Sequence, residues 1–140
     1  MKDFKEIKRI LREKGIVFEE VHFTDTAISG RIKDTSKDKN YNPQDAIKTL
    51  LIETPKKIKA VILKSCDNID KKKLKGLIGK WSIVDKDTLE SEHGLVVGGI
   101  CLLVLECEIL IDRSVTVLNQ LSMGAGDISN GIKCKRRCFF

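Results

Sequence analysis

Two groups of residues in this chain have types and spacings that could do chemistry. One is Lys48-Thr49-Leu50, which opens an apolar run, and the other is the set of glycines between Gly94 and Gly126. Glycines at such spacings allow a positive φ, or let a ligand approach bare backbone N–H groups. A tight turn followed by a bulge also explains them, and spacing alone favours that interpretation.

The nucleophiles and possible metal ligands do not form a recognisable catalytic or metal-binding pattern. Cys101 lies in a run of Ile and Leu, which favours an inert core thiol over a nucleophile. His22 falls in an expected strand and His93 beside the glycines, so both are expected to be surface residues, with a place near the glycines as the alternative. Cys134 and Cys138 are four residues apart, but no second pair completes a tetrahedral zinc site. We therefore expect no metal and no cofactor.

The composition limits the class of partner. The formal net charge is +6, from 26 Lys and Arg against 20 Asp and Glu, which is compatible with a polyanionic partner. Aromatic residues make up 5% of the chain, too few for a base-stacking platform. Basic residues cluster at Lys71–Lys75 and Lys133–Arg137. Each cluster could contact phosphates or be a solvated surface, and the sequence leaves both interpretations open.

Length and patterning indicate one cytoplasmic domain spanning residues 1–140. At 140 residues the chain can bury a core of its own. The N-terminus is charged and amphipathic rather than a leader peptide, and five cysteines, an odd count, suggest free thiols in a reducing compartment. The longest apolar run, Gly94–Leu105, is too short to span a bilayer, so no membrane association is expected. The oligomeric state cannot be predicted.

Hydrophobic periodicity predicts helices interspersed with short strands. Helices are expected at residues 3–15, 69–79 and 87–93, with a short one beginning at Pro43. Strands are expected at residues 17–23, 48–52, 58–63, 81–84, 101–105, 108–111, 115–121 and 128–134. Residues 24–42 are polar and are expected to form a loop or a weak helix. Helices among mostly non-alternating strands favour an α+β domain with a mixed sheet.

Four motifs, in order, resemble the YbaK/ProX-type aminoacyl-tRNA-editing domain. They are Lys48-Thr49-Leu50, Gly94-x-x-x-Gly98-Gly99, Leu110-Ile111-Asp112 and Gly124-x-Gly126, and the resemblance runs from Val17 to about Lys133. This family includes free-standing deacylases that act on mischarged tRNA-Pro and the editing insertion of bacterial prolyl-tRNA synthetases. The resemblance implies a mixed sheet partly wrapped into a barrel and flanked by helices.

The resemblance also implies an activity and a set of site residues. The activity is hydrolysis of the ester that joins a wrong amino acid, a small one such as Cys or Ala, to the 3′ end of tRNA-Pro. The partners would be the aminoacylated tRNA and an aminoacyl-tRNA synthetase. Lys48 matches the family's lysine at the substrate site and is the expected catalytic residue. The expected substrate-binding residues are Gly94, Gly98, Gly99, Ile100, Asp112, Gly124 and Gly126.

An aminoacyl ester is activated, so its hydrolysis needs an oriented water and stabilisation of the developing oxyanion rather than a side-chain nucleophile. We hypothesise that backbone N–H groups near Gly98 and Gly99 hold the carbonyl oxygen. The ammonium of Lys48 would pair with the terminal phosphate or help neutralise the oxyanion. The free hydroxyl of the terminal ribose would orient the water. Asp112 would serve as a pocket residue or as support for a turn.

The chain departs from the family pattern in three places, one of which is a short loop before the strand that ends at Ile111-Asp112. Leu102 stands where the family usually has a proline after its double glycine, and the segment matching the family's first helix is a polar run, Ser29–Asn40. These departures favour an alternative function, a catalytically silent module that binds tRNA or a synthetase. A structural domain without a ligand is a third alternative, but it leaves the lysine and glycine motifs unexplained.

Overall fold

The computed structural model describes residues 2–23 and 42–138. The loop or weak helix predicted at residues 24–42 therefore lies outside the described residues, apart from Asn42. The same holds for the polar run Ser29–Asn40, where the sequence departs from the family's first helix.

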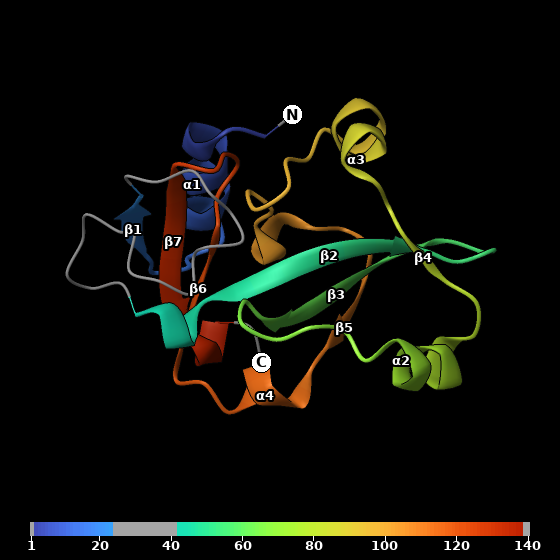
Figure 1. The fold of residues 1–140 in the computed structure, drawn as a ribbon. Helices are drawn as coiled ribbons and strands as arrows, with labels where there is room; N and C mark the ends of the chain where they lie inside the picture. Colours follow the sequence, from blue (N-terminus) through green and yellow to red (C-terminus); the bar gives the residue numbers. More distant parts are fainter. Residues whose placement is uncertain (1, 24–41, 139–140) are drawn as a thin grey trace.

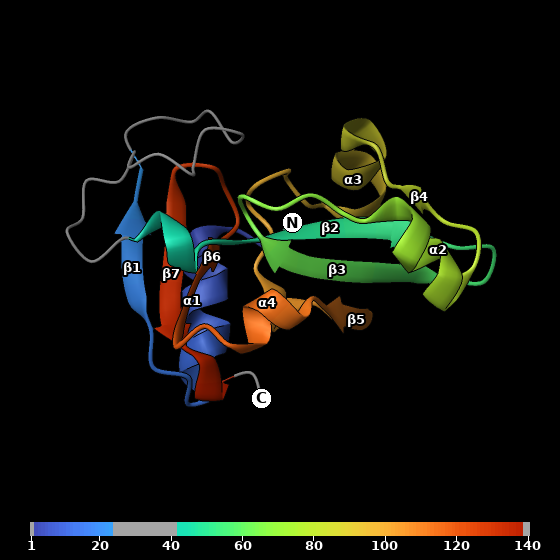
Figure 2. The same ribbon diagram turned by 60° about the horizontal axis from the view of Figure 1, so that its bottom comes forward.

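Two sheets form the centre of the fold (Figure 1, Figure 2). The first has the order β1-β7-β6 and is antiparallel. The second has the order β4-β2-β3-β5 and is mixed, because β5 runs parallel to β3 while the other pairs are antiparallel. The strands are β1 (Glu19–His22), β2 (Ile47–Glu53), β3 (Ile58–Lys64), β4 (Ser82–Ile83), β5 (Glu108–Ile111), β6 (Gln120–Gly124) and β7 (Asn130–Lys135). A single parallel bridge between Ala46 and Ser122 links the sheets. The α+β prediction with a mixed sheet is confirmed, and the sheets do not close into a barrel.

Aspartate side chains begin all four α-helices of the described residues. Asp3, Asp70, Asp85 and Asp112 each accept a hydrogen bond from a backbone N–H in the first turn, which satisfies a donor that the helix itself leaves unpaired. The helices are α1 (Phe4–Glu13), α2 (Lys71–Ile78), α3 (Lys86–His93) and α4 (Arg113–Thr116). The same described residues also form three 3₁₀ turns: η2 (Pro43–Asp45), η3 (Leu102–Val104) and η4 (Arg136–Cys138).

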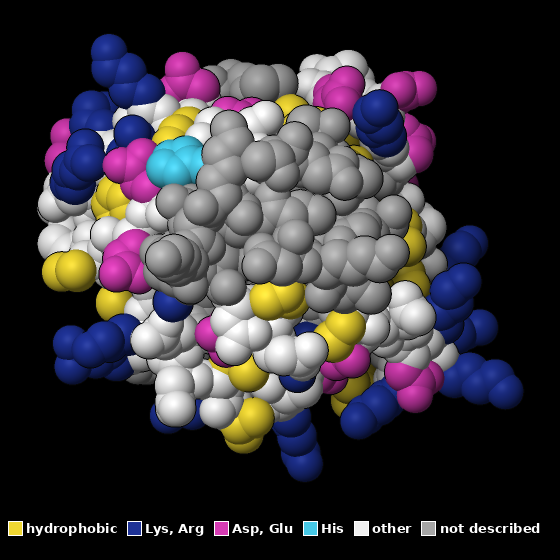
Figure 3. Space-filling model, turned by 60° about the vertical axis from the view of Figure 1, so that its left-hand side comes forward, with side chains coloured by type: hydrophobic (Ala, Val, Ile, Leu, Met, Phe, Trp, Pro, Cys, Tyr) yellow, Lys and Arg dark blue, Asp and Glu magenta, His cyan; other side chains and the backbone are white. Residues whose placement is uncertain are grey.

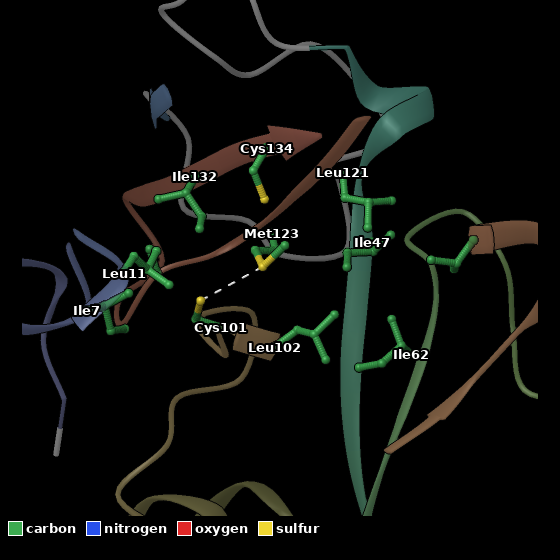
Figure 4. Packing of buried hydrophobic residues seen from close by; sticks show 12 residues of the cluster. Ile7, Leu11, Ile47, Ile62, Cys101, Leu102, Leu121, Met123, Ile132 and Cys134 are labelled. Atoms are coloured by element: carbon green, nitrogen blue, oxygen red, sulfur yellow. Dashed lines mark hydrogen bonds between the residues drawn. The ribbon is translucent and has the colours of Figure 1, made fainter. Parts of the chain in front are cut away.

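The main core lies where α1 and the two sheets meet (Figure 4). Ile7 and Leu11, one turn apart on α1, are buried against Leu121 of β6 and Ile132 of β7. Ile47, from the second sheet, reaches the same cluster, so one core joins both sheets. The burial of these side chains fixes how β2 sits against β6, which is where the candidate site lies.

Two of the predicted strands were wrong. The apolar run at residues 101–105 forms η3 rather than a strand, and the run at residues 115–121 begins as α4 and becomes β6 only at Gln120. A short apolar run has no period that separates a buried strand from a buried helical turn. In the second case the side chain of Asp112 decides the outcome, since it accepts a hydrogen bond from the backbone N–H of Ser114 and starts a helix.

Candidate functional site

The glycine-containing loop between α3 and η3 packs backbone against backbone on the end of β6. Gly94 ends α3 in the left-handed conformation, with φ of 63°, and Gly98 turns the loop with φ of 82°. The N–H of Gly126 donates to the carbonyl of Gly99 at 2.7 Å. A Cβ placed on Gly124 would lie 2.5 Å from the carbonyl oxygen of Gly98. Because the backbones of Gly98-Gly99 and Gly124 are in direct contact, a Cβ at Gly124 would clash, which explains why the two glycine motifs occur together.

This loop separates two cavities. The first, of about 430 Å³, lies between β2, β6 and the loop, and its walls include Lys48, Gly98, Ile100 and Gly124. These are four of the eight site residues expected from the sequence. Its other walls are mostly apolar and include Val21, Phe23, Leu50, Val97, Met123 and Ile132. Its volume falls within the range of small-molecule sites. We take this cavity as the candidate site.

The other expected site residues lie elsewhere. Gly94, Gly99 and Gly126 line the second cavity, of about 480 Å³, on the opposite side of the loop. Asp112 borders neither cavity. Its carboxylate accepts hydrogen bonds from Ser114 at the start of α4. Those hydrogen bonds lower the pKa of the Asp112 carboxyl. Its position supports a capping role.

Lys48 provides the cationic side chain of the candidate site. It lies near the start of β2, opposite Leu63 of β3, and its side chain is half-buried. Among the described residues, no carboxylate lies within ion-pair distance of its ammonium. An ammonium held at a mostly apolar cavity without a counter-ion attracts an anion or a developing negative charge.

Two residues that line the same cavity carry buried hydroxyl groups that sequence reasoning missed. The Oγ1 of Thr49 and the Oγ of Ser122 are both buried, and neither has a hydrogen-bond partner among the described residues. Each hydroxyl can donate one hydrogen bond and accept two, and burial without a partner costs about 1–3 kcal/mol. Thr49 sits within the lysine motif, and Ser122 is a polar residue in the apolar run of β6. Those were the signals available in the sequence.

The backbone of Thr49 adds a further donor and acceptor to this wall. Hydrogen bonds from Ser65 N to Ala46 O and from Thr54 N to Lys57 O fix which residues of β2 bond to β3. By the alternation of an antiparallel pair, the N–H and C=O of Thr49 point away from β3. On that outer edge β4 pairs only with the far end of β2, so in the described chain no strand covers Thr49.

We expect Ser122→Ala and Thr49→Val to stabilise the protein while impairing the site. Each change removes a buried hydroxyl that lacks a partner, so the free energy of unfolding should rise or stay level, by up to about 1 kcal/mol. If the hydroxyls bind substrate, turnover at low substrate concentration should fall about tenfold. Urea unfolding and steady-state kinetics on the same samples measure both effects. A loss of stability with unchanged kinetics would show that the hydroxyls only support the fold.

Neither Cys101 nor the two histidines form a nucleophilic centre. Cys101 is 1% exposed, and burial raises the pKa of its thiol to about 11, so the thiol stays protonated at neutral pH. His22 lies 3.7 Å from the carboxylate of Glu20 on the surface, and His93 occupies the last turn of α3, at the second cavity. The candidate site thus depends on Lys48, hydroxyls and backbone groups.

The buried thiols give the protein a pH-dependent stability. Burial raises the pKa of Cys101 to about 11 and that of Cys134 to about 12, whereas an unfolded thiol titrates near 8.5. Above that pH the unfolded chain loses protons that the folded chain keeps, so the free energy of unfolding should fall as the pH rises from 9 to 11. Urea titrations at several pH values measure the decline. A Cys101→Ala, Cys134→Ala variant should show a smaller decline, and an equal decline would contradict this assignment.

Leu102, the departure from the family proline, occupies the first position of η3. The first position of a helix is the one that suits proline, because its N–H needs no partner within the helix. Leu102 is 5% exposed and packs in the main core. The leucine therefore starts the same kind of turn while adding apolar contact, and the loop before it keeps its tight turn through the Gly99 N–H to Val96 O bond of 2.8 Å.

The described residues contain neither a metal-binding cluster nor a membrane-spanning helix. Within residues 2–23 and 42–138, no three His, Cys, Asp or Glu side chains gather closely enough to hold a metal ion. None of the helices in this part of the chain has both the length and the apolar character needed to cross a bilayer.

Comparisons with solved structures show the same fold in three proteins. A candidate trans-editing enzyme for prolyl-tRNA synthetase is 11% identical, with a TM-score of 0.77 over 96% of this chain and 87% of that one. The hypothetical protein APE2540 is 15% identical, with a TM-score of 0.74 over 94% and 89%. A candidate signal transduction protein from Marinobacter aquaeolei VT8 is 11% identical, with a TM-score of 0.68 over 95% of this chain but 27% of that longer one. At these identities the likeness concerns the fold.

The family is shown by the sequence itself. No curated protein sequence matches the chain. The sequence profile of the aminoacyl-tRNA editing domain matches residues 30–130, which is most of the chain and includes the lysine and glycine motifs of the candidate site. The chain therefore belongs to the aminoacyl-tRNA editing domain family.

Proposed function

We propose that the protein hydrolyses the ester bond of a mischarged aminoacyl-tRNA, with tRNA-Pro carrying a small wrong amino acid such as Cys or Ala as its substrate. One observation carries the proposal. Lys48, Thr49 and Ser122 line one cavity beside the glycine loop, and the hydroxyls of Thr49 and Ser122 have no partner among the described residues, in a chain of the editing family. The resemblance of the fold to a candidate trans-editing enzyme for prolyl-tRNA synthetase supports the choice of tRNA.

The geometry suggests how the groups divide the work. The Lys48 ammonium neutralises negative charge, either on the terminal phosphate or on the carbonyl oxygen as water attacks it. The N–H of Gly99 is engaged by Val96 O inside the turn, so it does not serve as the oxyanion donor. We assign the donation to the oxyanion to the hydroxyls of Thr49 and Ser122 and to the N–H of Thr49, which points away from β3. The free hydroxyl of the terminal ribose orients the attacking water, and no side-chain nucleophile takes part.

The apolar wall of the cavity selects the amino acid. Phe23, Ile100 and Met123 line it together with smaller side chains, which suits a short side chain such as that of Cys or Ala. An apolar pocket separates side chains that differ by one methylene by only about 1–3 kcal/mol. We therefore expect a preference for one small amino acid with weaker activity on its neighbours in size. Since the substrate is an intermediate of translation, we place the activity in the cytoplasm.

Deacylation of a panel of tRNAs tests the proposal. Transcripts of tRNA-Pro and of a second tRNA would be charged with Cys, Ala, Ser or Pro, and release of the amino acid would be followed with the full chain. Release of a small wrong amino acid from tRNA-Pro, with correctly charged Pro-tRNA-Pro spared, is the expected result. Binding of tRNA without release of any amino acid would contradict the proposal and select the catalytically silent module.

A further inference from the structure

Helix α2 carries a concentration of positive charge, and most of it lies at the N-terminal end, where it is unfavourable for the helix. Four of its eight residues are lysines, and its first turn contains no acidic side chain. Lys71, Lys72 and Lys73 occupy that first turn and are exposed. The positive end of the helix dipole lies there, so lysines oppose it where aspartate or glutamate would be favourable. Lysines that destabilise the helix in which they lie indicate a function outside that helix.

The lysines of α2 form no ion pair among the described residues, as is true of other lysines in that part of the chain, including Lys5, Lys48 and Lys86. Lys57 and Lys59 both pair with Glu108, at 2.6 Å and 3.4 Å, and they lower the pKa of its carboxyl. Among the described residues, no carboxylate lies within 4.0 Å of an ammonium of α2. On the face drawn in Figure 3, by contrast, acidic side chains lie among the basic ones.

The lysines of α2 lie on two different flanks of its buried stripe. Leu74 is buried against the second sheet, and Ile78, one turn later, packs in the same cluster. At 100° per residue, Lys73 lies on one flank of this buried stripe, while Lys71 and Lys75 lie on the other. The hydrogen bonds from Ser114 mainly lower the pKa of Asp112, which follows β5, and the charge of Lys73 adds a smaller contribution. We therefore leave Lys73 out of the proposed contact surface, which consists of Lys71, Lys72 and Lys75.

The cavity and α2 border the same face of the second sheet, the cavity at the start of β2 and α2 toward its far end (Figure 2). Lys48, Leu50 and Ile52 alternate onto one face of β2, and Leu50 and Ile52 pack in the cluster of Leu74. The side chain of Lys48 is therefore directed to the sheet face that α2 covers. Ser65 lines the cavity, and six residues later the chain reaches Lys71, a span of at most about 20 Å. Figure 2 shows this connection running from the start of β2 to α2.

We infer that Lys71, Lys72 and Lys75 bind the phosphate backbone of the tRNA acceptor end whose aminoacylated terminus occupies the cavity at Lys48. The inference rests on the proposed function. A polyanion that ends at Lys48 and continues along this face of the sheet toward α2 reaches these three ammonium groups. Contacts of this kind position a nucleic acid without reading its sequence, so they add affinity for any tRNA.

The test compares two triple variants of the full chain that change the net charge equally. One is Lys71→Gln, Lys72→Gln, Lys75→Gln. The matched control is Lys5→Gln, Lys14→Gln, Lys86→Gln, which replaces exposed lysines on α1, at its C-terminal cap and on α3. Binding of uncharged tRNA-Pro would be measured from 50 to 200 mM salt. Each lost phosphate contact lowers the magnitude of the slope of log affinity against log salt concentration by about 0.7–0.9. This slope should therefore decrease in magnitude by about 2 to 3 in the α2 variant and by less than about 1 in the control.

A second substrate separates this inference from the proposed function. The α2 variant should hydrolyse a 3′-aminoacyl-adenosine as fast as the wild type, because that substrate reaches only the cavity, while its KM for full aminoacyl-tRNA rises at least tenfold. Equal salt slopes in the two triple variants would overturn the inference even if both deacylate tRNA. Absence of deacylation with a reduced slope in the α2 variant alone would support the lysine contacts and contradict the proposed function.

Discussion

Replacement of Lys48 by alanine is expected to lower the rate of deacylation about 100- to 1,000-fold, the usual effect of removing one group that stabilises a developing oxyanion. The ammonium is the cationic side chain in the wall of the candidate cavity. Because it forms no ion pair among the described residues, its removal should change the free energy of unfolding by less than about 0.5 kcal/mol. Single-turnover deacylation with excess protein measures the chemical step directly.

Two further variants sharpen this experiment. Lys48→Met keeps the aliphatic stem and removes the charge, so it should be as slow as the alanine variant. Lys64→Ala removes a half-buried lysine from the neighbouring strand β3, outside the cavity, and should keep full activity. If Lys48→Met deacylates at the wild-type rate, the charge has no part in the reaction.

Replacement of Gly124 by alanine is expected to damage the fold and the site together. Its Cβ would lie 2.5 Å from the carbonyl oxygen of Gly98 and 2.8 Å from the Cα of Gly99, well inside van der Waals contact with backbone that cannot rotate away. Overpacking of this kind destabilises by about 1–3 kcal/mol. Because the displaced loop is a wall of the cavity, turnover should fall at least tenfold at temperatures where the variant is still folded. Thermal unfolding by circular dichroism and kinetics below the transition measure the two effects.

Gly76 provides the matched control for Gly124. It lies inside α2, and a Cβ at this position meets no atom within 4 Å. Gly76→Ala should therefore stabilise the protein by about 0.5–1 kcal/mol and leave turnover unchanged. A Gly124→Ala protein as stable as the wild type would mean that the loop can move away from β6 without cost.

The elements that carry strong local signals could be predicted from the sequence. Asp3, the first residue of the helix predicted at residues 3–15, caps α1, and Gly15, the last residue of that range, follows the end of α1 with φ of 73°. The hairpin of β2 and β3 turns at Thr54–Lys57, where Thr54 N bonds to Lys57 O at 2.9 Å. The errors at residues 101–105 and 115–121 arose in apolar runs, where burial rather than a period decides between strand and turn.

The candidate site was predictable only in part. Lys48, Gly98, Ile100 and Gly124 share a cavity, as the motifs suggested. The division of the remaining glycines onto the other side of the loop is a consequence of how the loop packs on β6, and no spacing in the sequence encodes it. Thr49 and Ser122 escaped notice for a related reason. An unpartnered hydroxyl is defined by its surroundings, and those come from strands far apart in the chain.

The pairing of the first strand with the last has a consequence for the protein's own synthesis. Glu19 of β1 pairs with Lys133 of β7, and the cavity is closed by β6, which is made shortly before β7. In a chain emerging from the ribosome, Lys48 is therefore synthesised long before β6, which forms the opposite wall of the cavity. Such distant pairings also make folding slow, because they must overcome a large loss of chain entropy first. A nascent chain released before residue 120 would lack one wall of the site as well as the partners of β1, so it could not act on the tRNAs around the ribosome that made it.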